Sequence, residues 1–229
     1  AWAGQYSRIK MDYHVGIIGF GNMGSAMAER IKKISYNFKK IKILVYDKDT
    51  EKTKNVSAGI YVASNIRDLV QNVDTVILAI KPQDFDNLLS EIKDIAKGRL
   101  FISIAAGITT TYIEKILGDT EIIRAMPNLP SKIGEGMIGL CKGKFASQSV
   151  LELATDLFYS LGRVITTEEK MMNAVTAISG SGPAYVCEFL ESKQFSPDSI
   201  PKGEKQSFLS EFQQAAEGVG FNKKTAALL

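Results

Sequence analysis

Short apolar runs alternate with amphipathic segments along most of the chain. Apolar, mostly β-branched runs predict buried strands, and they lie at residues 15–18, 41–47, 59–63, 74–82, 100–106, 121–126, 136–141 and 162–166. Between them, apolar side chains recur at steps of three and four, which is typical of helices that cover a sheet. Such helices are expected at residues 25–34, 65–70, 85–96 and 150–161, with a short one after Thr111. This alternation with short links predicts an α/β fold, a Rossmann-type doubly wound and mostly parallel sheet.

After Thr166 the pattern becomes helical. Residues 168–178 and 184–192 have helical character, and the glycine- and proline-containing residues 179–183 interrupt it. Residues 193–207 contain two prolines and few apolar side chains, so we expect an exposed loop there, followed by a helix at 208–218. Thr111 with Glu114, and Thr166 with Glu169, have the spacing of a capping box. The pattern therefore divides the chain into a dinucleotide-binding domain, residues 13–166, and a partial helical segment, residues 167–229.

Three glycines follow the first predicted strand. In the stretch VGIIGFGNMG, Gly19, Gly21 and Gly24 have G-x-G-x-x-G spacing between a strand and a helix. In dinucleotide-binding proteins the first glycine permits a tight turn, the second lets the backbone approach a pyrophosphate, and the third lets helix and strand pack closely. The helix N-terminus then presents unpaired N–H groups to the phosphates. The stretch predicts dinucleotide binding; the alternative is a glycine-rich turn in another kind of α/β protein.

Asp47 ends the second predicted strand, about where a ribose-binding acid is expected. A carboxylate there would accept hydrogen bonds from the ribose hydroxyls and repel a 2′-phosphate, which favours NAD. Lys48 and Lys52 weaken that argument, so the choice between NADH and NADPH stays open. The alternative for Asp47 is a solvated loop acid.

Composition excludes several other classes of function. The 229 residues carry 28 basic and 25 acidic side chains, a net charge of +3 that is too small to indicate a nucleic-acid or membrane partner. One histidine (His14) and two cysteines (Cys141 and Cys187) leave no metal site, His-based triad or disulfide framework. No apolar run reaches the roughly 20 residues that span a bilayer. The first residues show no signal-peptide pattern, so we expect a cytoplasmic protein, and the lack of an initiator Met suggests a fragment.

Five motifs together resemble one enzyme family. IGFGNMG, LAIKP, SIAAGIT, IIRAMPNLP and AVTAISGSGPAYV, between about Tyr13 and Val186, are similar in order and spacing to pyrroline-5-carboxylate reductases. That family reduces a cyclic imine to proline with NADPH or NADH. The resemblance implies cofactor contacts from two groups of residues. These are Ile18, Gly19, Phe20, Gly21, Asn22, Met23 and Gly24, and then Asp47, Asn65, Ala79, Ile80, Lys81, Pro82, Ala105 and Ala106.

The resemblance also implies which residues lie near the substrate. They are Met126, Asn128, Glu169 and Ser181, with no metal and no assigned catalytic acid. Each has a simpler structural role open to it, for example Glu169 as a capping-box partner, Met126 as a core residue and Lys81 as a solvated strand end. Imine reduction can proceed by orientation and electrostatics, so the lack of a strong side-chain acid is no objection.

The family has a helical second domain that forms the dimer and carries a Ser-Pro-Gly-Gly-Thr-Thr motif, and this sequence shows no such motif. We therefore expect a homo-oligomer only if the helical domain is complete, and little reductase activity from this chain as written. One alternative is a non-catalytic dinucleotide-binding subunit. The other is a dehydrogenase for 3-hydroxy acids, for which the expected lysine in the second domain is not evident.

Overall fold

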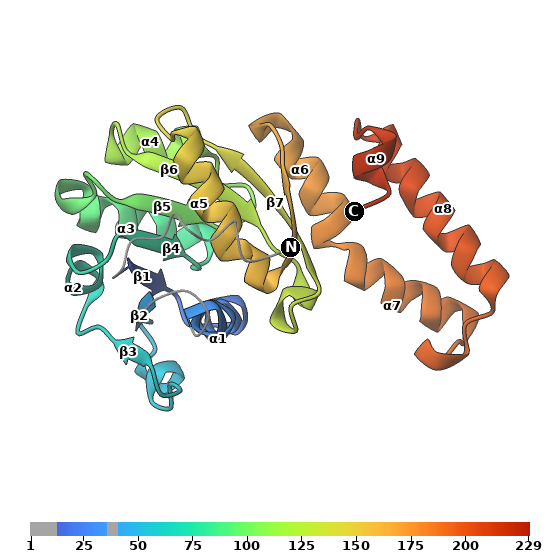
Figure 1. The fold of residues 1–229 in the computed structure, drawn as a ribbon, viewed down its shortest axis with the longest axis horizontal. Coiled ribbons are helices and arrows are strands. Elements are labelled where there is room, and N and C mark those ends of the chain that lie inside the picture. Colours follow the sequence, from blue (N-terminus) through green and yellow to red (C-terminus); the bar gives the residue numbers. More distant parts are fainter. Residues whose placement is uncertain (1–12, 36–40) are drawn as a thin grey trace.

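The computed structural model describes residues 13–35 and 41–229, so the predicted absence of a signal peptide falls outside the described residues. Eight strands form one sheet in the order β3-β2-β1-β4-β5-β6-β7-β8 (Figure 1). The strands are β1 (Tyr13–Ile18), β2 (Ile41–Tyr46), β3 (Ile60–Val62), β4 (Thr75–Leu78), β5 (Leu100–Ser103), β6 (Glu121–Met126), β7 (Gly136–Lys142) and β8 (Gly162–Thr166). The pairs from β3 to β6 are parallel. The predicted mostly parallel α/β sheet is confirmed.

β7 departs from the parallel pattern. It pairs antiparallel with β6, whereas β8 runs parallel to β7. Only residues 127–135 connect β6 to β7, and they contain a single 3-10 turn, Leu129–Lys132. A parallel crossover needs about a dozen residues or more, so this link can only reverse the chain. The strands predicted at 59–63, 74–82 and 100–106 are shorter than expected, because outer residues such as Gly59, Pro82 and Ala106 already lie in turns.

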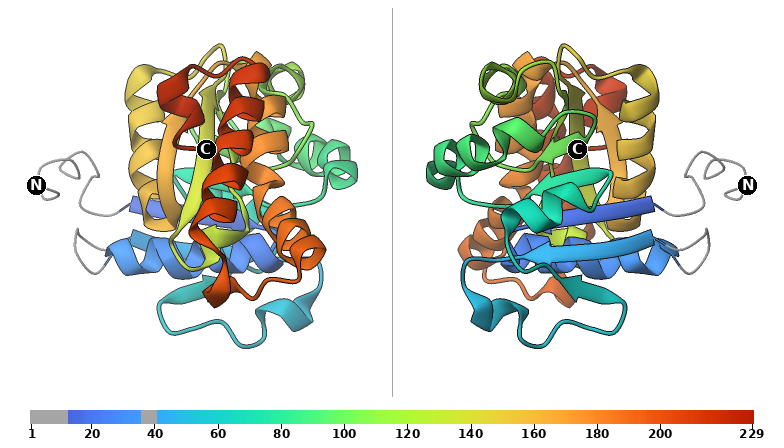
Figure 2. Two further views of the ribbon diagram at one scale, coloured as in Figure 1. Left: turned by 90° about the vertical axis from the view of Figure 1, so that its right-hand side faces the viewer. Right: turned by 90° about the vertical axis from the view of Figure 1, so that its left-hand side faces the viewer.

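Helices cover both faces of the sheet. α1 (Asn22–Ser35) and α5 (Gln148–Phe158) pack on one face, and α2 (Ile66–Gln71), α3 (Phe85–Ile92) and α4 (Thr110–Leu117) on the other (Figure 2). Alternate residues of a strand enter the two cores: Val15 and Ile17 contact the first, and Ile18 the second. This two-sided burial explains why the strands are nearly continuous apolar runs.

Both predicted capping boxes are wrong. α4 is capped by Thr109, whose side chain accepts from the N–H of Tyr112, two residues before the predicted cap. Thr166 is the last residue of β8, and Glu169 opens a 3-10 turn, Glu169–Met171, with its carboxylate bonded elsewhere. The spacing of a capping box is common enough to recur by chance. β8 ends where the domain boundary was expected, and the division into two domains stays a prediction.

The C-terminal part is a chain of helices: α6 (Met172–Val175), a π-helical turn (Thr176–Gly180), α7 (Gly182–Lys193), α8 (Lys202–Gly218) and α9 (Lys223–Ala226). The interruption predicted at 179–183 lies partly in this π turn, whereas Gly182 and Pro183 already belong to the first turn of α7. The loop is shorter than the expected 193–207, because residues 202–207 are already helical; their Lys, Glu and Gln side chains favour helix once Pro201 has ended the turn.

α7 and α8 project away from the sheet (Figure 1). Aromatic rings join them, with the centroids of Phe189 and Phe208 4.5 Å apart. None of the α7 residues is buried. A third apolar core attaches α6, α8 and α9 to β7, and its members include Cys141, Met172, Ala216 and Ala226. No helix within residues 13–35 and 41–229 is long and apolar enough to cross a membrane.

Candidate cofactor and substrate site

A cleft of about 520 Å³ opens at the carboxyl ends of β1, β2 and β4. β1 lies between β2 and β4, so the strand order reverses here, which is where ligands bind in open α/β sheets. Seven of the predicted cofactor residues line the cleft: Ile18, Gly19, Gly21, Asp47, Ala79, Ile80 and Lys81. Sequence reasoning missed other lining residues, among them Tyr46, Ile66, Gln83, Asp84, Asn87, Leu88 and Glu91. Only proximity in the fold brings these to the cleft.

The three glycines of the turn differ in what surrounds them. Gly19 has φ +97°, and a Cβ there would lie 2.4 Å from the carbonyl oxygen of Ala79. A Cβ on Gly24 would lie 1.9 Å from the carbonyl oxygen of Gly19, so α1 packs directly on the turn. A Cβ on Gly21 would meet nothing within 4 Å. Gly21 therefore presents bare backbone to the open cleft, as a pyrophosphate-binding turn requires.

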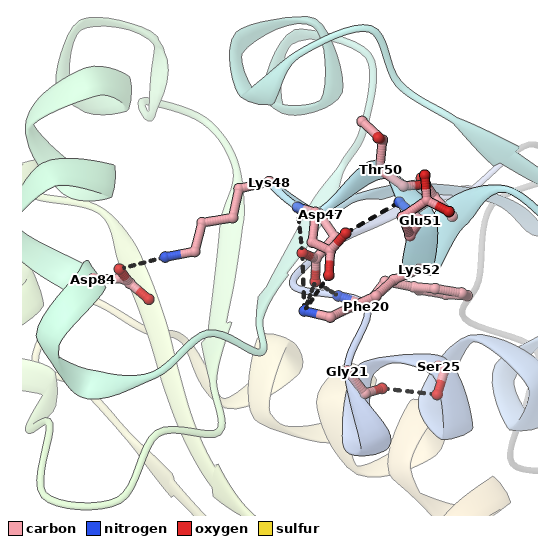
Figure 3. Close-up of polar contacts among 11 residues, drawn as sticks. Phe20, Gly21, Ser25, Asp47, Lys48, Thr50, Glu51, Lys52 and Asp84 are labelled. Carbon is pink, nitrogen blue, oxygen red and sulfur yellow. Dashed lines mark hydrogen bonds and ion pairs between the residues drawn. The ribbon is translucent and has the colours of Figure 1, made fainter.

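The N-terminus of α1 faces the same region. The Ser25 hydroxyl donates to the carbonyl of Gly21 at 2.8 Å and fixes the first turn (Figure 3). The N–H groups of a first helical turn have no partner inside the helix, and the helix dipole adds positive potential. This combination favours an anion, so the turn fits the diphosphate of a dinucleotide.

Asp47 is buried, and both of its carboxylate oxygens have donors. One accepts from the N–H of Phe20 at 2.7 Å, and the other from the N–H of Asp49 at 2.9 Å and from Lys52 Nζ at 3.2 Å (Figure 3). Burial alone would raise the pKa of Asp47, but the two backbone donors and Lys52 hold that pKa below its ordinary value. The alternative of a solvated loop acid is wrong, because Asp47 is only 8% exposed. Its carboxylate ties β2 to the glycine turn.

Lys48 points away from Asp47 and crosses toward the segment after β4 (Figure 3). Its Nζ lies 2.9 Å from Asp84 Oδ1, at the end of the 3-10 turn Pro82–Asp84. Both residues line the cleft. The cleft therefore has lysines and carboxylates at its β2 end and apolar side chains such as Ile66, Ile80 and Leu88 along its wall.

The remaining predicted cofactor residues lie outside the cleft lining. Asn65 caps α2 by accepting from the N–H of Asp68, and Pro82 opens a 3-10 turn. Ala105 is buried and Ala106 exposed just after β5. Phe20, Asn22 and Met23 belong to the glycine turn and the start of α1. Their contacts with a cofactor stay predictions.

Glu169 joins the helical part to the sheet. Its carboxylate accepts from the Thr110 hydroxyl at 2.6 Å, from the Thr110 N–H at 3.1 Å and from Arg124 Nη1 at 2.7 Å. Burial would raise the pKa of Glu169, but the Thr110 and Arg124 donors lower it below the ordinary value. Sequence reasoning missed Arg124, which is 2% exposed. The signal was present, since Arg124 is a charged residue within the apolar strand EIIRAM.

The other predicted substrate residues lie at or just beyond the end of β6 and directly after the π turn. The Asn128 amide donates to the carbonyl of Ser179 at 3.2 Å and accepts from the N–H of Met137 at 3.0 Å. The Ser181 hydroxyl donates to the carbonyl of Thr176 at 3.3 Å. Met126 is half-buried and packs against the third core, which supports its interpretation as a core residue. Asn128 thus holds the π turn against β7, and a substrate contact by any of these residues stays a prediction.

A second, apolar hollow of about 620 Å³ begins at Asn128. It runs between the π turn, α7, α8 and α9, and its lining includes Val186, Phe208, Leu209 and Phe212. Leu209 is 55% exposed. The hollow is lined by different residues from those of the cleft at the glycine turn.

The fold and the glycine-turn cleft together define a dinucleotide-binding oxidoreductase. Residues 14–107 match the family described as NADP oxidoreductase, coenzyme F420-dependent, and residues 169–194 match pyrroline-5-carboxylate reductase dimerisation. The chain is 38% identical over 187 residues to a pyrroline-5-carboxylate reductase of Aquifex aeolicus, covering 80% of this chain and 68% of that protein. The chain belongs to the pyrroline-5-carboxylate reductase family.

Solved structures agree with this assignment. The 1-pyrroline-5-carboxylate reductase of Streptococcus pyogenes superposes with a TM-score of 0.72 at 28% identity, covering 91% of this chain and 80% of that one. A pyrroline carboxylate reductase of Plasmodium falciparum with NADP bound superposes with a TM-score of 0.71 at 25% identity, covering 94% of this chain and 97% of that one. The similarity therefore extends through the helical part.

Proposed function

We propose that this chain catalyses the reduction of 1-pyrroline-5-carboxylate to L-proline with NADPH or NADH. The observation that carries the proposal is the free space beside Gly21, in the cleft where the strand order reverses. The match to the reductase family in both the sheet and the helical part supports it. The non-catalytic subunit and the 3-hydroxy acid dehydrogenase are not favoured, because the relatives and solved structures described above are pyrroline-5-carboxylate reductases.

The residues of the cleft suit a reduced nicotinamide dinucleotide. The turn from Gly19 to Gly24 and the start of α1 would hold the diphosphate, and Ile66, Ile80 and Leu88 offer an apolar wall. When bound, the cofactor supplies a hydride to the carbon of the C=N bond, and the nitrogen takes a proton. The protein then has to bind, orient and shield the reactants, which needs no nucleophile.

We place the substrate beyond the carboxyl end of β6. Met126 ends that strand and Asn128 follows two residues later. Glu169 and Ser181 belong to the helical part, and Glu169 bonds Arg124 of β6. The Glu169–Arg124 and Asn128–Ser179 contacts support this placement, since they fix the helices against the sheet at that end. These residues would set the position of the imine relative to the cofactor. A cytoplasmic location stays a prediction.

We also infer a homo-oligomer formed through the helical part. The match of residues 169–194 to a dimerisation family supports it, as does the exposure of apolar side chains on α7 and α8 such as Tyr185, Val186 and Leu209. Apolar patches of this kind mark interaction sites in most proteins.

Two measurements on one preparation test the proposed function. Oxidation of NADPH and of NADH is followed with 1-pyrroline-5-carboxylate, and cofactor binding is titrated directly without substrate. We expect cofactor binding and turnover. This replaces the low activity expected from the missing Ser-Pro-Gly-Gly-Thr-Thr motif, because the similarity to solved reductases extends through the helical part. Binding without turnover would favour the non-catalytic subunit, and turnover with a 3-hydroxy acid but not with the imine would favour the dehydrogenase.

A further inference from the structure

An ion pair spans the cleft at its β2 end. Lys48 lies two residues beyond the end of β2, and Asp84 lies after β4, 36 residues later. Lys48 Nζ and Asp84 Oδ1 are nevertheless 2.9 Å apart. The side chains of Lys48 and Asp84 are 76% and 34% exposed. The hydrogen bond from Lys48 therefore joins two segments that meet only across the cleft (Figure 3).

The end of β2 is where the adenosine ribose lies in dinucleotide-binding folds, and a residue there distinguishes a 2′-hydroxyl from a 2′-phosphate. Asp47 holds that position, but its carboxylate is occupied by the Phe20 and Asp49 N–H groups and by Lys52. A carboxylate whose oxygens already have these donors has little capacity left for ribose hydroxyls. Asp47 is therefore a positioning residue for the glycine turn, and the choice of cofactor falls to other groups.

Most charged side chains around this end of the cleft form ion pairs, and the acids outnumber the lysines by five (Asp47, Asp49, Glu51, Asp84 and Glu91) to three (Lys48, Lys52 and Lys54). Lys52 compensates Asp47 at 3.2 Å and also lies 4.0 Å from Asp49, while Glu51 pairs with Lys54 at 2.5 Å. Glu91 lines the same cleft. Lys48, in contrast, forms its ion pair with Asp84, outside the group of residues that holds the glycine turn. Lys48 is thus a cation whose partner can be replaced without breaking the contacts of that turn.

A 2′-phosphate is a stronger partner for Lys48 than Asp84 is. Exposed carboxylate–lysine pairs contribute little because water screens both charges. A phosphate monoester carries between one and two negative charges near neutral pH and has three acceptor oxygens, against the single charge of a carboxylate. Lysine binds phosphate well as a point charge. Bound NADPH would therefore exchange the partner of Lys48, and NADH would leave the ion pair intact.

We propose that Lys48 and Asp84 together set the preference between NADPH and NADH, with Asp84 as an internal competitor for the 2′-phosphate. In the free protein Asp84 holds Lys48 across the cleft. NADPH takes Lys48 from Asp84 and gains an ion pair that NADH cannot form. The inference rests on the proposed function, and it favours NADPH, in contrast to what Asp47 alone suggests.

The test is the ratio of dissociation constants for NADPH and NADH, measured by titration of the protein with each nucleotide. Lys48→Ala should raise the dissociation constant for NADPH about fivefold or more and change that for NADH by less than about twofold. Asp84→Asn should tighten NADPH binding about threefold, because it removes the competitor for Lys48, and leave NADH binding unchanged. Calorimetry with adenosine 2′,5′-bisphosphate and AMP should repeat the pattern without the nicotinamide.

Two further variants separate competition by Asp84 from a general effect of charge. Glu204→Gln removes one charge from another exposed ion pair, Lys193–Glu204 at 3.3 Å between α7 and α8, and should leave the ratio unchanged. In the Lys48→Ala background, Asp84→Asn should raise the affinity for NADPH much less, because Asp84 then has no Lys48 to compete for.

The inference would be overturned if Lys48→Ala weakened the binding of NADPH and NADH equally, or if Glu204→Gln raised the affinity for NADPH as much as Asp84→Asn does. Either result would leave the proposed function standing. Failure of the unmodified protein to bind either nucleotide would overturn both.

Discussion

Gly21 is the residue of the turn where a side chain would fit into the free protein but would block the bound cofactor. Nothing lies within 4 Å of a Cβ placed there, so Gly21→Val should leave the free energy of unfolding nearly unchanged. The valine would fill the space that the pyrophosphate needs. We expect the dissociation constant for NADH to rise at least about tenfold, or 1.4 kcal/mol, in a direct titration.

Gly24→Ala is the matched control, with the opposite pattern. Its Cβ would lie 1.9 Å from the Gly19 carbonyl, so this change should lower the melting temperature. Unaltered NADH binding by Gly21→Val would show that the glycine turn is not the cofactor site. Unfolding by Gly21→Val would contradict only the expected steric tolerance at position 21.

Asp47 holds the glycine turn in place, a role that the sequence did not reveal. Asp47→Ser should weaken NADPH and NADH together, because it frees the Phe20 and Asp49 N–H groups that hold the turn. A side-chain change that only removed electrostatic repulsion would raise the affinity for NADPH alone. Titrations with both nucleotides distinguish the two outcomes.

The pH dependence of Asp47 follows from its lowered pKa. A carboxyl with a lower pKa in the folded state stabilises the protein above the pKa of the unfolded chain, and this contribution disappears as the pH falls through the folded-state pKa. The free energy of unfolding of the unmodified protein should therefore exceed that of Asp47→Asn at pH 7, and the difference should shrink below about pH 4. Urea titrations at several pH values measure it. A difference that grows on acidification would contradict the role given to Asp47.

Among the structural elements, the connection between the 3-10 turn at Glu169 and the sheet is the most informative. Arg124 on β6 is buried and donates to Glu169, 45 residues later. Glu169→Gln would leave a buried guanidinium without its counter-charge, which should cost roughly 1–3 kcal/mol of unfolding free energy. Partial exposure of Glu169, 30% for its side chain, keeps the effect below that of a fully buried pair.

Glu168→Gln controls for the charge change at the same turn. Glu168 pairs with Lys170 on the surface, where both side chains are largely exposed, at 73% and 76%. Chemical unfolding of this variant should match the unmodified protein, because exposed pairs contribute little. If Glu168→Gln and Glu169→Gln lowered the free energy of unfolding equally, the Arg124 contact would have no special role in stability.

For the whole molecule, the exposed helices predict self-association. Leu209 on α8 lines the apolar hollow and is 55% exposed. Sedimentation at micromolar concentration should show a dimer or larger assembly, and Leu209→Lys should shift it toward the monomer because a charge is costly to bury in an apolar interface. Val62→Lys places the same charge on an exposed apolar residue of the edge strand β3, and should leave the assembly intact. Dissociation by Val62→Lys rather than by Leu209→Lys would assign the interface to the sheet edge.

The sequence by itself determined the fold class, the glycine turn and the family. Each depends on local pattern: apolar runs of strand length, helical periodicity, and G-x-G-x-x-G spacing at a strand–helix junction. These signals survive without tertiary structure because the backbone geometry of strands, helices and tight turns is set by neighbouring residues.

Only the tertiary structure decided how the polar side chains are paired. Lys48 meets Asp84, Arg124 meets Glu169, and Asp47 meets the N–H of Phe20. Each contact joins residues that lie 27 to 45 positions apart, so no local spacing predicts it. The antiparallel direction of β7 was likewise set by how residues 127–135 return to the sheet. Side-chain partners depend on which segments the packed core brings together, and that is a property of the whole chain.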